Sequence, residues 1–168
     1  RTAASNLNFT AGQTVPNLVV VPVKDGKVTF YNHAGSVDLI ADVAGYFKTG
    51  ASGAEYKPVT PARLMDTRAG LGVPQAALGA GETVDLAVDR PGASAVVLNV
   101  TATGPTAGSF VSVYPYGTER TAASNLNFTA GQTVPNLVVV PVKDGKVTFY
   151  NRTGSVHLIA DIAGYYRN

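Results

Sequence analysis

Arginine and aspartate side chains gather in two segments of the chain and have the clearest potential for chemistry. Arg63, Asp66 and Arg68 lie within one strand-like segment. Asp161 lies near the end of a second segment, and an earlier copy of that segment carries Asp42 at the same position. Period-2 alternation places Asp66 and Arg68 on one face and Arg63 on the other. Two carboxylates could act as general acid and base in glycoside hydrolysis. We favour a structural role, in which Arg–Asp pairs tie the ends of the domain together.

A second polar set combines asparagines with tyrosines. Asn125 and Asn127 alternate with apolar residues, so both should point away from the core. Amide groups beside aromatic rings suit sugar hydroxyls, which need donors and acceptors next to a flat apolar surface. The rings would come from Tyr114, Tyr116 and Tyr150. These five residues are the candidate glycan-binding face, although asparagine also commonly satisfies backbone groups in turns and at strand edges.

The sequence carries no other catalytic or metal-binding pattern. It has no cysteine, which excludes disulfides, thiolate metal sites and a cysteine nucleophile. His33 and His157 do not have the spacing of metal ligands, and no serine lies in a nucleophile-elbow pattern. We therefore expect no catalytic residues, no metal and no cofactor, and a protein that is not an enzyme.

Charge and hydropathy argue against two classes of partner. The 13 Lys and Arg residues are dispersed and leave a net charge of +2, unlike the clustered basic stripe of a nucleic-acid-binding protein. No apolar run approaches the roughly 18 residues of a membrane span. The start at Arg1 suggests a processed chain or an excerpt of a longer one. We expect binding to neither nucleic acid nor the membrane interior.

The elements that must position these residues belong to a long internal repeat. Residues 1–47 align with residues 120–166 without a gap. Five positions differ, namely His33/Arg152, Ala34/Thr153, Asp38/His157, Val43/Ile162 and Phe47/Tyr166. The period is far longer than the 20–50 residues of a solenoid unit and is the size of a small domain. The repeat therefore indicates a tandem array of domains.

Short segments rich in Val, Thr, Tyr and Phe alternate with Gly, Pro, Asn and Asp, which predicts an all-β protein. The predicted strands are residues 62–68, 82–88, 95–103, 109–115, 123–128, 136–142, 146–151 and 155–166. Residues 136–142 are apolar on both faces, which predicts a central strand. The sequence KDGK at 143–146 predicts a type I′ hairpin turn, because Asp-Gly supplies positive φ angles. Residues 104–108 read as a longer hairpin loop.

These strands favour a compact antiparallel β-sandwich-like module of about eight strands. A β-trefoil or a small barrel is the alternative. Residues 59–168 form a complete repeat module, and residues 48–58 form a flexible linker. Residues 1–47 are then the second half of another module, which needs completion in cis or in trans.

Six motifs in order resemble a known repeat module. They are PARLMDTR at 61–68, VVLNVTAT at 96–103, FVSVYP at 110–115, SNLNF at 124–128, NLVVVPV at 136–142 and DIAGYY at 161–166. The pattern resembles a module, often beginning PARLLDTR and ending DVxGYF, of secreted and cell-surface proteins of actinobacteria and some other bacteria. The resemblance implies an extracellular accessory module and brings no catalytic residues with it.

We call residues 59–119 half A and residues 120–166 half B, so that residues 1–47 are the first copy of half B. One half A can complete only one half B, because the other would expose strands with open edges. The missing partner could precede this stretch of chain, could be half A of this chain in a permuted fold, or could come from a neighbouring chain by strand complementation.

From these observations we expect a non-enzymatic module at the cell surface or outside the cell. Its role would be structural and adhesive, as part of a repeat array or a filament built head-to-tail from neighbouring copies. The alternative is a carbohydrate-binding module that anchors a secreted protein to cell-wall or surface polysaccharide.

Overall fold

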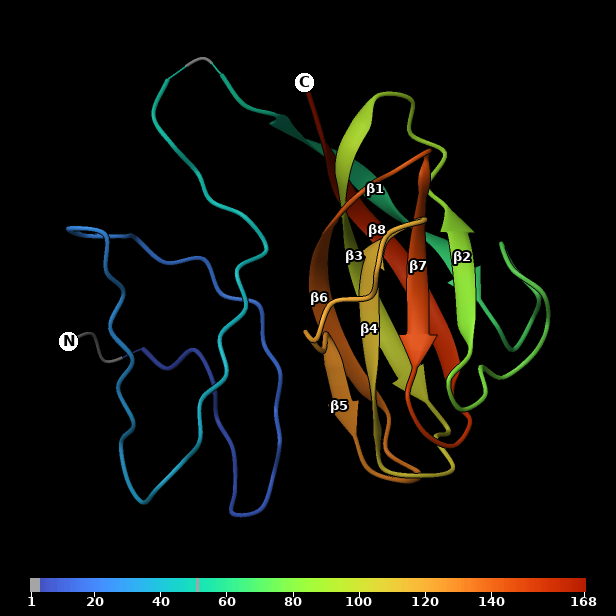
Figure 1. The fold of residues 1–168 in the computed structure, drawn as a ribbon, viewed down its shortest axis with the longest axis horizontal. Helices are drawn as coiled ribbons and strands as arrows, with labels where there is room; N and C mark the ends of the chain where they lie inside the picture. Colours follow the sequence, from blue (N-terminus) through green and yellow to red (C-terminus); the bar gives the residue numbers. More distant parts are fainter. Residues whose placement is uncertain (1–3, 51) are drawn as a thin grey trace.

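In a computed structural model that describes residues 4–50 and 52–168, residues from Glu55 onward fold into a sandwich of two antiparallel sheets (Figure 1). The strands are β1 (Glu55–Asp66), β2 (Thr83–Ala87), β3 (Ala93–Thr103), β4 (Ser109–Pro115), β5 (Leu126–Phe128), β6 (Val134–Pro141), β7 (Lys146–Asn151) and β8 (His157–Arg167). The prediction of an all-β sandwich with eight strands is confirmed. Two separate four-stranded sheets do not fit the trefoil or barrel alternatives.

The order of strands within the sheets interleaves the two halves of the module. One sheet has the order β1-β8-β3-β6 and the other β2-β7-β4-β5. Half A supplies β1 to β4 and half B supplies β5 to β8. Every pair of neighbouring strands therefore joins half A to half B. Neither half contains a single ladder of its own.

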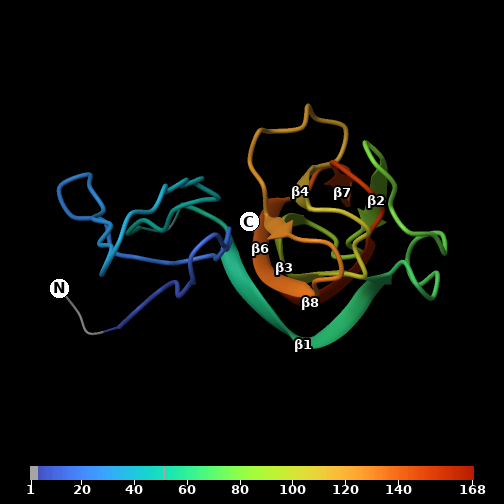
Figure 2. The same ribbon diagram turned by 90° about the horizontal axis from the view of Figure 1, so that it is seen from below.

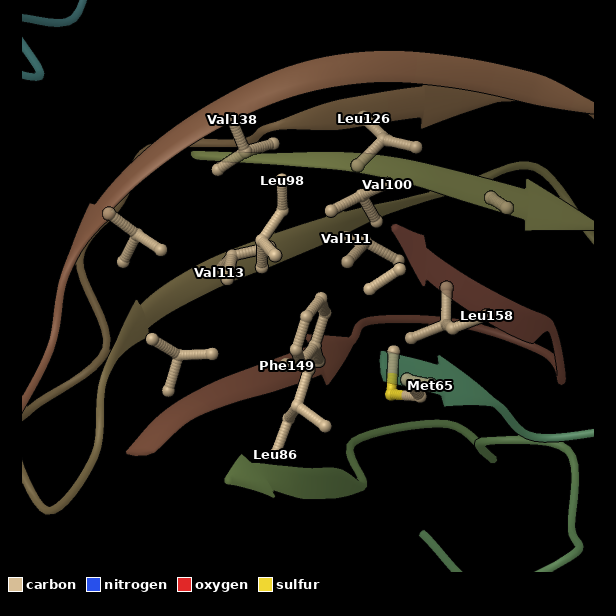
Figure 3. Close-up of a cluster of buried hydrophobic side chains, with 14 of the residues drawn as sticks. Met65, Leu86, Leu98, Val100, Val111, Val113, Leu126, Val138, Phe149 and Leu158 are labelled. Carbon is tan, nitrogen blue, oxygen red and sulfur yellow. The ribbon is translucent and has the colours of Figure 1, made fainter. Parts of the chain in front are cut away.

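The core lies between the two sheets and draws on both halves (Figure 3). Half A contributes Met65 and Leu98, and half B contributes Phe149 and Leu158, each with no exposed surface. The alternation of β-branched and aromatic residues with polar ones directs one face of each strand inward. Burial of this face is what holds the two sheets together.

Two strands differ from the sequence-based predictions. β1 begins at Glu55, so part of the expected linker is strand, and half A extends over residues 55–119 in the structure. β6 lies at the edge of its sheet and not at the centre. An edge suits this strand because Pro135 and Pro141 have no N–H to donate to a second neighbour.

The turn KDGK forms as predicted, with φ angles of 50° at Asp144 and 71° at Gly145. The strands that it connects, β6 and β7, belong to different sheets. Residues 104–108 likewise connect β3 with β4 in the other sheet, so they are not the hairpin loop that we expected. Turn chemistry fixes the local reversal of the chain but not the partner of each strand.

The first copy of half B has a different appearance. Between residues 4 and 50 the structure contains no strand, and an isolated bridge joins Lys24 to Lys27. This part of the chain follows an irregular, looping path beside the sandwich and outside both sheets (Figures 1 and 2). Within the described residues no helix is long and apolar enough to cross a membrane.

Candidate functional site

The predicted arginine–aspartate cluster joins β1 to β8. The Arg63 guanidinium donates from Nε to Asp161 Oδ1 at 2.9 Å and from Nη2 to Oδ2 at 3.3 Å. Arg63 Nη1 also lies 3.4 Å from Asp66 Oδ2. The prediction that Arg63 and Asp66 lie on opposite faces is therefore wrong. A register irregularity between Arg63 and Met65 breaks the alternation and brings the two side chains together.

Asp66 is the most constrained carboxylate of this cluster. Its oxygens accept hydrogen bonds from the backbone N–H of Arg68 at 3.0 Å, from Nε at 2.9 Å and from Nη2 at 2.7 Å. The Arg68 guanidinium holds the pKa of Asp66 well below its usual range, although burial acts in the opposite direction. Asp66 stays ionised, so it cannot be the protonated general acid that glycoside hydrolysis requires.

An open hollow of about 340 Å³ lies beside the Arg63–Asp161 pair on the outer face of the first sheet. Pro61, Asn99 and Ala163 contribute to its walls. The charged groups at this hollow bind each other, because both oxygens of Asp161 accept hydrogen bonds from Arg63. This geometry ties strands together and leaves no carboxylate oxygen of Asp161 without a donor.

The tyrosines of the candidate glycan-binding face have different environments on the second sheet. Tyr114 is buried, and burial raises the pKa of its hydroxyl. The Tyr150 ring is covered by the Arg120 guanidinium, 4.5 Å from the ring centroid. Lys146 Nζ lies 4.9 Å from the centroid of Tyr116, just beyond the end of β4. Tyr114 and Tyr150 come from adjacent strands, but cationic side chains cover the two rings that are more exposed.

The two asparagines of this face make hydrogen bonds within the fold. Asn125 Oδ1 accepts a hydrogen bond from the backbone N–H of Val113 at 2.6 Å. Asn127 Nδ2 donates to Ser124 Oγ at 3.1 Å, and Asn127 pairs with Phe110 across β5 and β4. Asn127 therefore lies beside the aromatic residues, whereas the amide oxygen of Asn125 extends the β4–β5 ladder.

Sequence reasoning missed the role of Asn151, which is completely buried. Its Nδ2 lies within hydrogen-bonding distance of the Leu78 and Gly79 carbonyls of half A, at 3.0 and 3.2 Å, and of the Gly154 carbonyl at 3.0 Å. Its Oδ1 accepts a hydrogen bond from Ser109 Oγ at 2.9 Å. The signal was the Asn-x-x-Gly spacing, which indicates a side chain that turns back on its own loop.

The first copy of half B keeps the hydrogen bonds that are internal to half B. Asn17 Nδ2 donates to the Asn6 carbonyl at 2.6 Å, as Asn136 Nδ2 does to the Asn125 carbonyl at 2.7 Å. Lys24 and Lys27 exchange backbone hydrogen bonds of 3.1 and 2.9 Å, the counterparts of those between Lys143 and Lys146. The first copy therefore holds the local turns of half B.

Asn32 retains only the local part of the hydrogen bonds that Asn151 makes. Its Nδ2 lies 3.0 Å from the Ala34 carbonyl and 2.9 Å from the Gly35 carbonyl. Within the described residues it has no counterpart of the bonds to Leu78, Gly79 and Ser109. All the partners that it lacks belong to half A.

The apolar face of the first copy is exposed. Phe149 is completely buried, whereas its counterpart Phe30 is 59% exposed. Further exposed members, with the buried counterpart second, are Phe9/Phe128, Val19/Val138, Val21/Val140, Val28/Val147, Val37/Val156, Leu39/Leu158 and Val43/Ile162. We call these eight residues of the first copy, Phe30 included, the open face. Large apolar side chains exposed in such number are typical of interaction sites.

Two further positions mark where half A would sit on the first copy. A side chain at Gly164 would collide with the ring of Tyr56, whereas nothing lies within 4 Å of the corresponding position at Gly45. Asp42, the counterpart of Asp161, has no ion-pair partner among the described residues. In the first copy, therefore, no side chain contacts Gly45 as Tyr56 contacts Gly164, and Asp42 lacks the arginine that Asp161 binds, among the described residues.

The described residues contain no group of three or more His, Cys, Asp or Glu side chains that could hold a metal ion. Comparisons with models of known families, with curated proteins and with solved structures returned no match.

Proposed function

We propose that the protein is a non-enzymatic, extracellular repeat module with a structural and adhesive role, and that the open face accepts a further half A. The further half A would come from a neighbouring unit of the same kind, in cis or in trans. Modules would then join head-to-tail by strand complementation. One observation carries this proposal: a nearly identical sequence forms four strands where half A pairs with it and none, in the described residues, where half A does not.

The energetics support a further half A as the occupant of the open face. Burial of one Val, Leu or Phe side chain contributes about 1.5–3 kcal/mol. The eight partly exposed residues of the open face thus leave on the order of 10 kcal/mol of hydrophobic free energy unused. Half A fits this surface, because it covers the near-identical surface of residues 120–166 in the same molecule.

Stoichiometry decides where the further half A must come from. The chain carries two copies of half B and a single half A. If half A of one molecule completes the first copy in another, the second copy in the donor molecule loses its partner. Self-association therefore gives no net gain in completed modules. A lasting filament needs units that contribute additional copies of half A.

The extracellular setting of this proposal comes from the six motifs that resemble modules of secreted and cell-surface bacterial proteins. The absence of a role in catalysis agrees with the ionised state of Asp66 and the mutual pairing of Arg63 and Asp161. The exposed apolar surface and the interleaved strands support a role in assembly.

The test is an extended chain in which a second copy of residues 55–119 precedes Arg1. The junction reproduces the natural sequence between Glu119 and Arg120, since Arg1 is the counterpart of Arg120. We expect two complete modules, so the calorimetric enthalpy of unfolding should about double relative to the original chain. The control carries Leu98→Asp in the added segment only and should unfold with the original enthalpy. An added segment that leaves the enthalpy unchanged would refute the proposal.

A carbohydrate-binding function is the second candidate, because Tyr150, Phe110 and Asn127 lie together on the outer face of the second sheet. The Phe110 and Tyr150 rings have centroids 6.4 Å apart and an interplanar angle of 51°. The test is binding of the protein to cell-wall and other insoluble polysaccharides, with Tyr150→Ala as the variant and Tyr31→Ala in the first copy as the control. Loss of binding in Tyr150→Ala alone would favour this function over assembly.

A further inference from the structure

The start of β1 is a meeting point of both copies of half B. Glu55 pairs with Arg167 and Tyr56 with Tyr166 at the end of β8. The Tyr166 ring lies 5.4 Å from the Tyr56 ring and 6.3 Å from the ring of Phe47, its own counterpart in the first copy. The end of the first copy therefore lies beside the end of β8, which in turn pairs with the first residues of half A.

The connection from the first copy to half A is short. Lys48 is the counterpart of Arg167, so residues 49–54 would link a strand ending at Lys48 to β1 beginning at Glu55. This is about the length of an ordinary connection between paired antiparallel strands. A permuted module of residues 1–119, in which the first copy takes the place of residues 120–166, needs no rearrangement within half A.

The contacts in such a permuted module would be nearly the same as those observed. The two copies differ at five positions. Val43 in place of Ile162 removes a methylene from the core, which should disfavour the permuted pairing by roughly five- to tenfold. His157 Nδ1 lies 3.0 Å from Thr67 Oγ1, which itself accepts the N–H of Leu158 and so has its own proton to donate. A carboxylate at Asp38 can accept the same proton.

We propose that half A is shared, so that the first copy exchanges with residues 120–166 as its partner within one molecule. When the first copy is paired, residues 120–166 become the open face. The chain can thus receive a further half A at either end, but only at one end at a time. This inference goes beyond the proposed function, since it needs no second molecule. The exchange is slow because every ladder of the module must break.

The test uses the full chain and three variants, Phe30→Ala, Phe149→Ala and the double variant. Phe30→Ala should leave the unfolding equilibrium constant unchanged. Phe149→Ala should raise it less than about tenfold, because the intact first copy takes over as partner of half A. The double variant, which has no intact copy, should raise it more than about 100-fold. Two residues that do not touch would then be strongly non-additive.

Deuterium labelling shows which copy is paired, since peptides that contain the differing positions distinguish the copies. In Phe149→Ala, protection should move from peptides near Arg152 to peptides near His33. If the double variant does not fold, Val28→Ala, Val147→Ala and their double variant give the same comparison with a smaller loss of stability. The proposal is overturned if Phe149→Ala is as damaging as the double variant. That result would leave the outcome for the extended chain unaffected.

Discussion

Residues 1–47 and 120–166 differ at five positions, yet the second segment contributes four strands to a sandwich and the described part of the first contributes none. The difference does not lie in the segments. It lies in half A, which supplies every neighbouring strand of the second copy. A segment of strong β propensity thus acquires strand structure only from a partner.

What both copies retain is equally informative. The turn at Lys24–Lys27 and the Asn17–Asn6 hydrogen bond are present in the first copy as they are in the second. These bonds close over short stretches of sequence and need no partner strand. Hydrogen bonds between residues close in sequence therefore preserve the turns of half B, while the β-ladders and the core depend on residues far apart in the chain.

The largest expected difference between the two copies is in amide hydrogen exchange. Labelling for seconds should exchange the backbone amides of residues 4–47 almost completely, because no ladder protects them. Amides of β6, β7 and β8 should exchange more than about a thousandfold more slowly. Mass spectrometry of peptides that carry the differing positions provides the measurement. Equal protection of the two copies would show that the first copy is already paired.

Loss of core packing in half A should come next in size. Leu98 has no exposed surface, and half A occurs once, so neither copy of half B can compensate for a defect in it. We expect Leu98→Ala to lower the free energy of unfolding by about 2–5 kcal/mol. Urea denaturation followed by circular dichroism measures this loss. Leu39→Ala, in the open face, is the matched control and should leave stability unchanged.

Acid should weaken the complete module through Asp66. The Arg68 guanidinium lowers the pKa of this carboxylate in the folded state. The ionised Asp66 therefore contributes its full share to the free energy of unfolding above the unfolded pKa of about 3.9. This contribution is lost progressively as the pH falls below that value. Asp66→Asn should cost about 2 kcal/mol at pH 6 and much less at pH 2.5. Urea midpoints at the two pH values test this, and an equal cost at both would contradict it.

The smallest expected difference separates Asp161 from Asp42. Asp161→Asn removes the charge and one of the two acceptors that Arg63 uses, and it should lower the melting temperature only slightly, because the pair is partly exposed. Asp42→Asn should have no effect, since Asp42 has no ion-pair partner in the described part of the chain. Melting temperatures of the two variants, compared at neutral pH, show whether Asp161 stabilises the fold while Asp42 does not. A lower melting temperature for Asp42→Asn would show that the first copy is engaged.

The sequence was sufficient to predict the existence of all eight strands, because alternation and turn residues are local signals. It could not predict that β6 lies at an edge, or that β3 and β4 belong to different sheets, since strand pairing depends on residues far apart in the chain. The face of Arg63 was mispredicted for a related reason. A register irregularity is a property of two strands together and leaves no mark on the alternation of one.

The candidate sites were likewise predictable only in part. Residue types pointed correctly to contacts among Arg63, Asp66, Arg68 and Asp161. The cations over Tyr150 and Tyr116 were not predictable, because Arg120 and Lys146 reach them across the folded sheet. Counting halves predicts that one half A cannot cover two copies of half B, and in the structure the first copy lies outside both sheets.

The pairing of Glu55 with Arg167 also determines how a chain of such modules would respond to tension. Force that enters at the start of β1 and leaves at the end of β8 acts on two residues that face each other. It would therefore open the β1–β8 ladder one hydrogen bond at a time, as a zipper opens, and would not load all the bonds in shear. Each module could then release roughly 370–400 Å of chain at full extension. A chain of such modules would lengthen under load, and each module would refold when its two halves pair again.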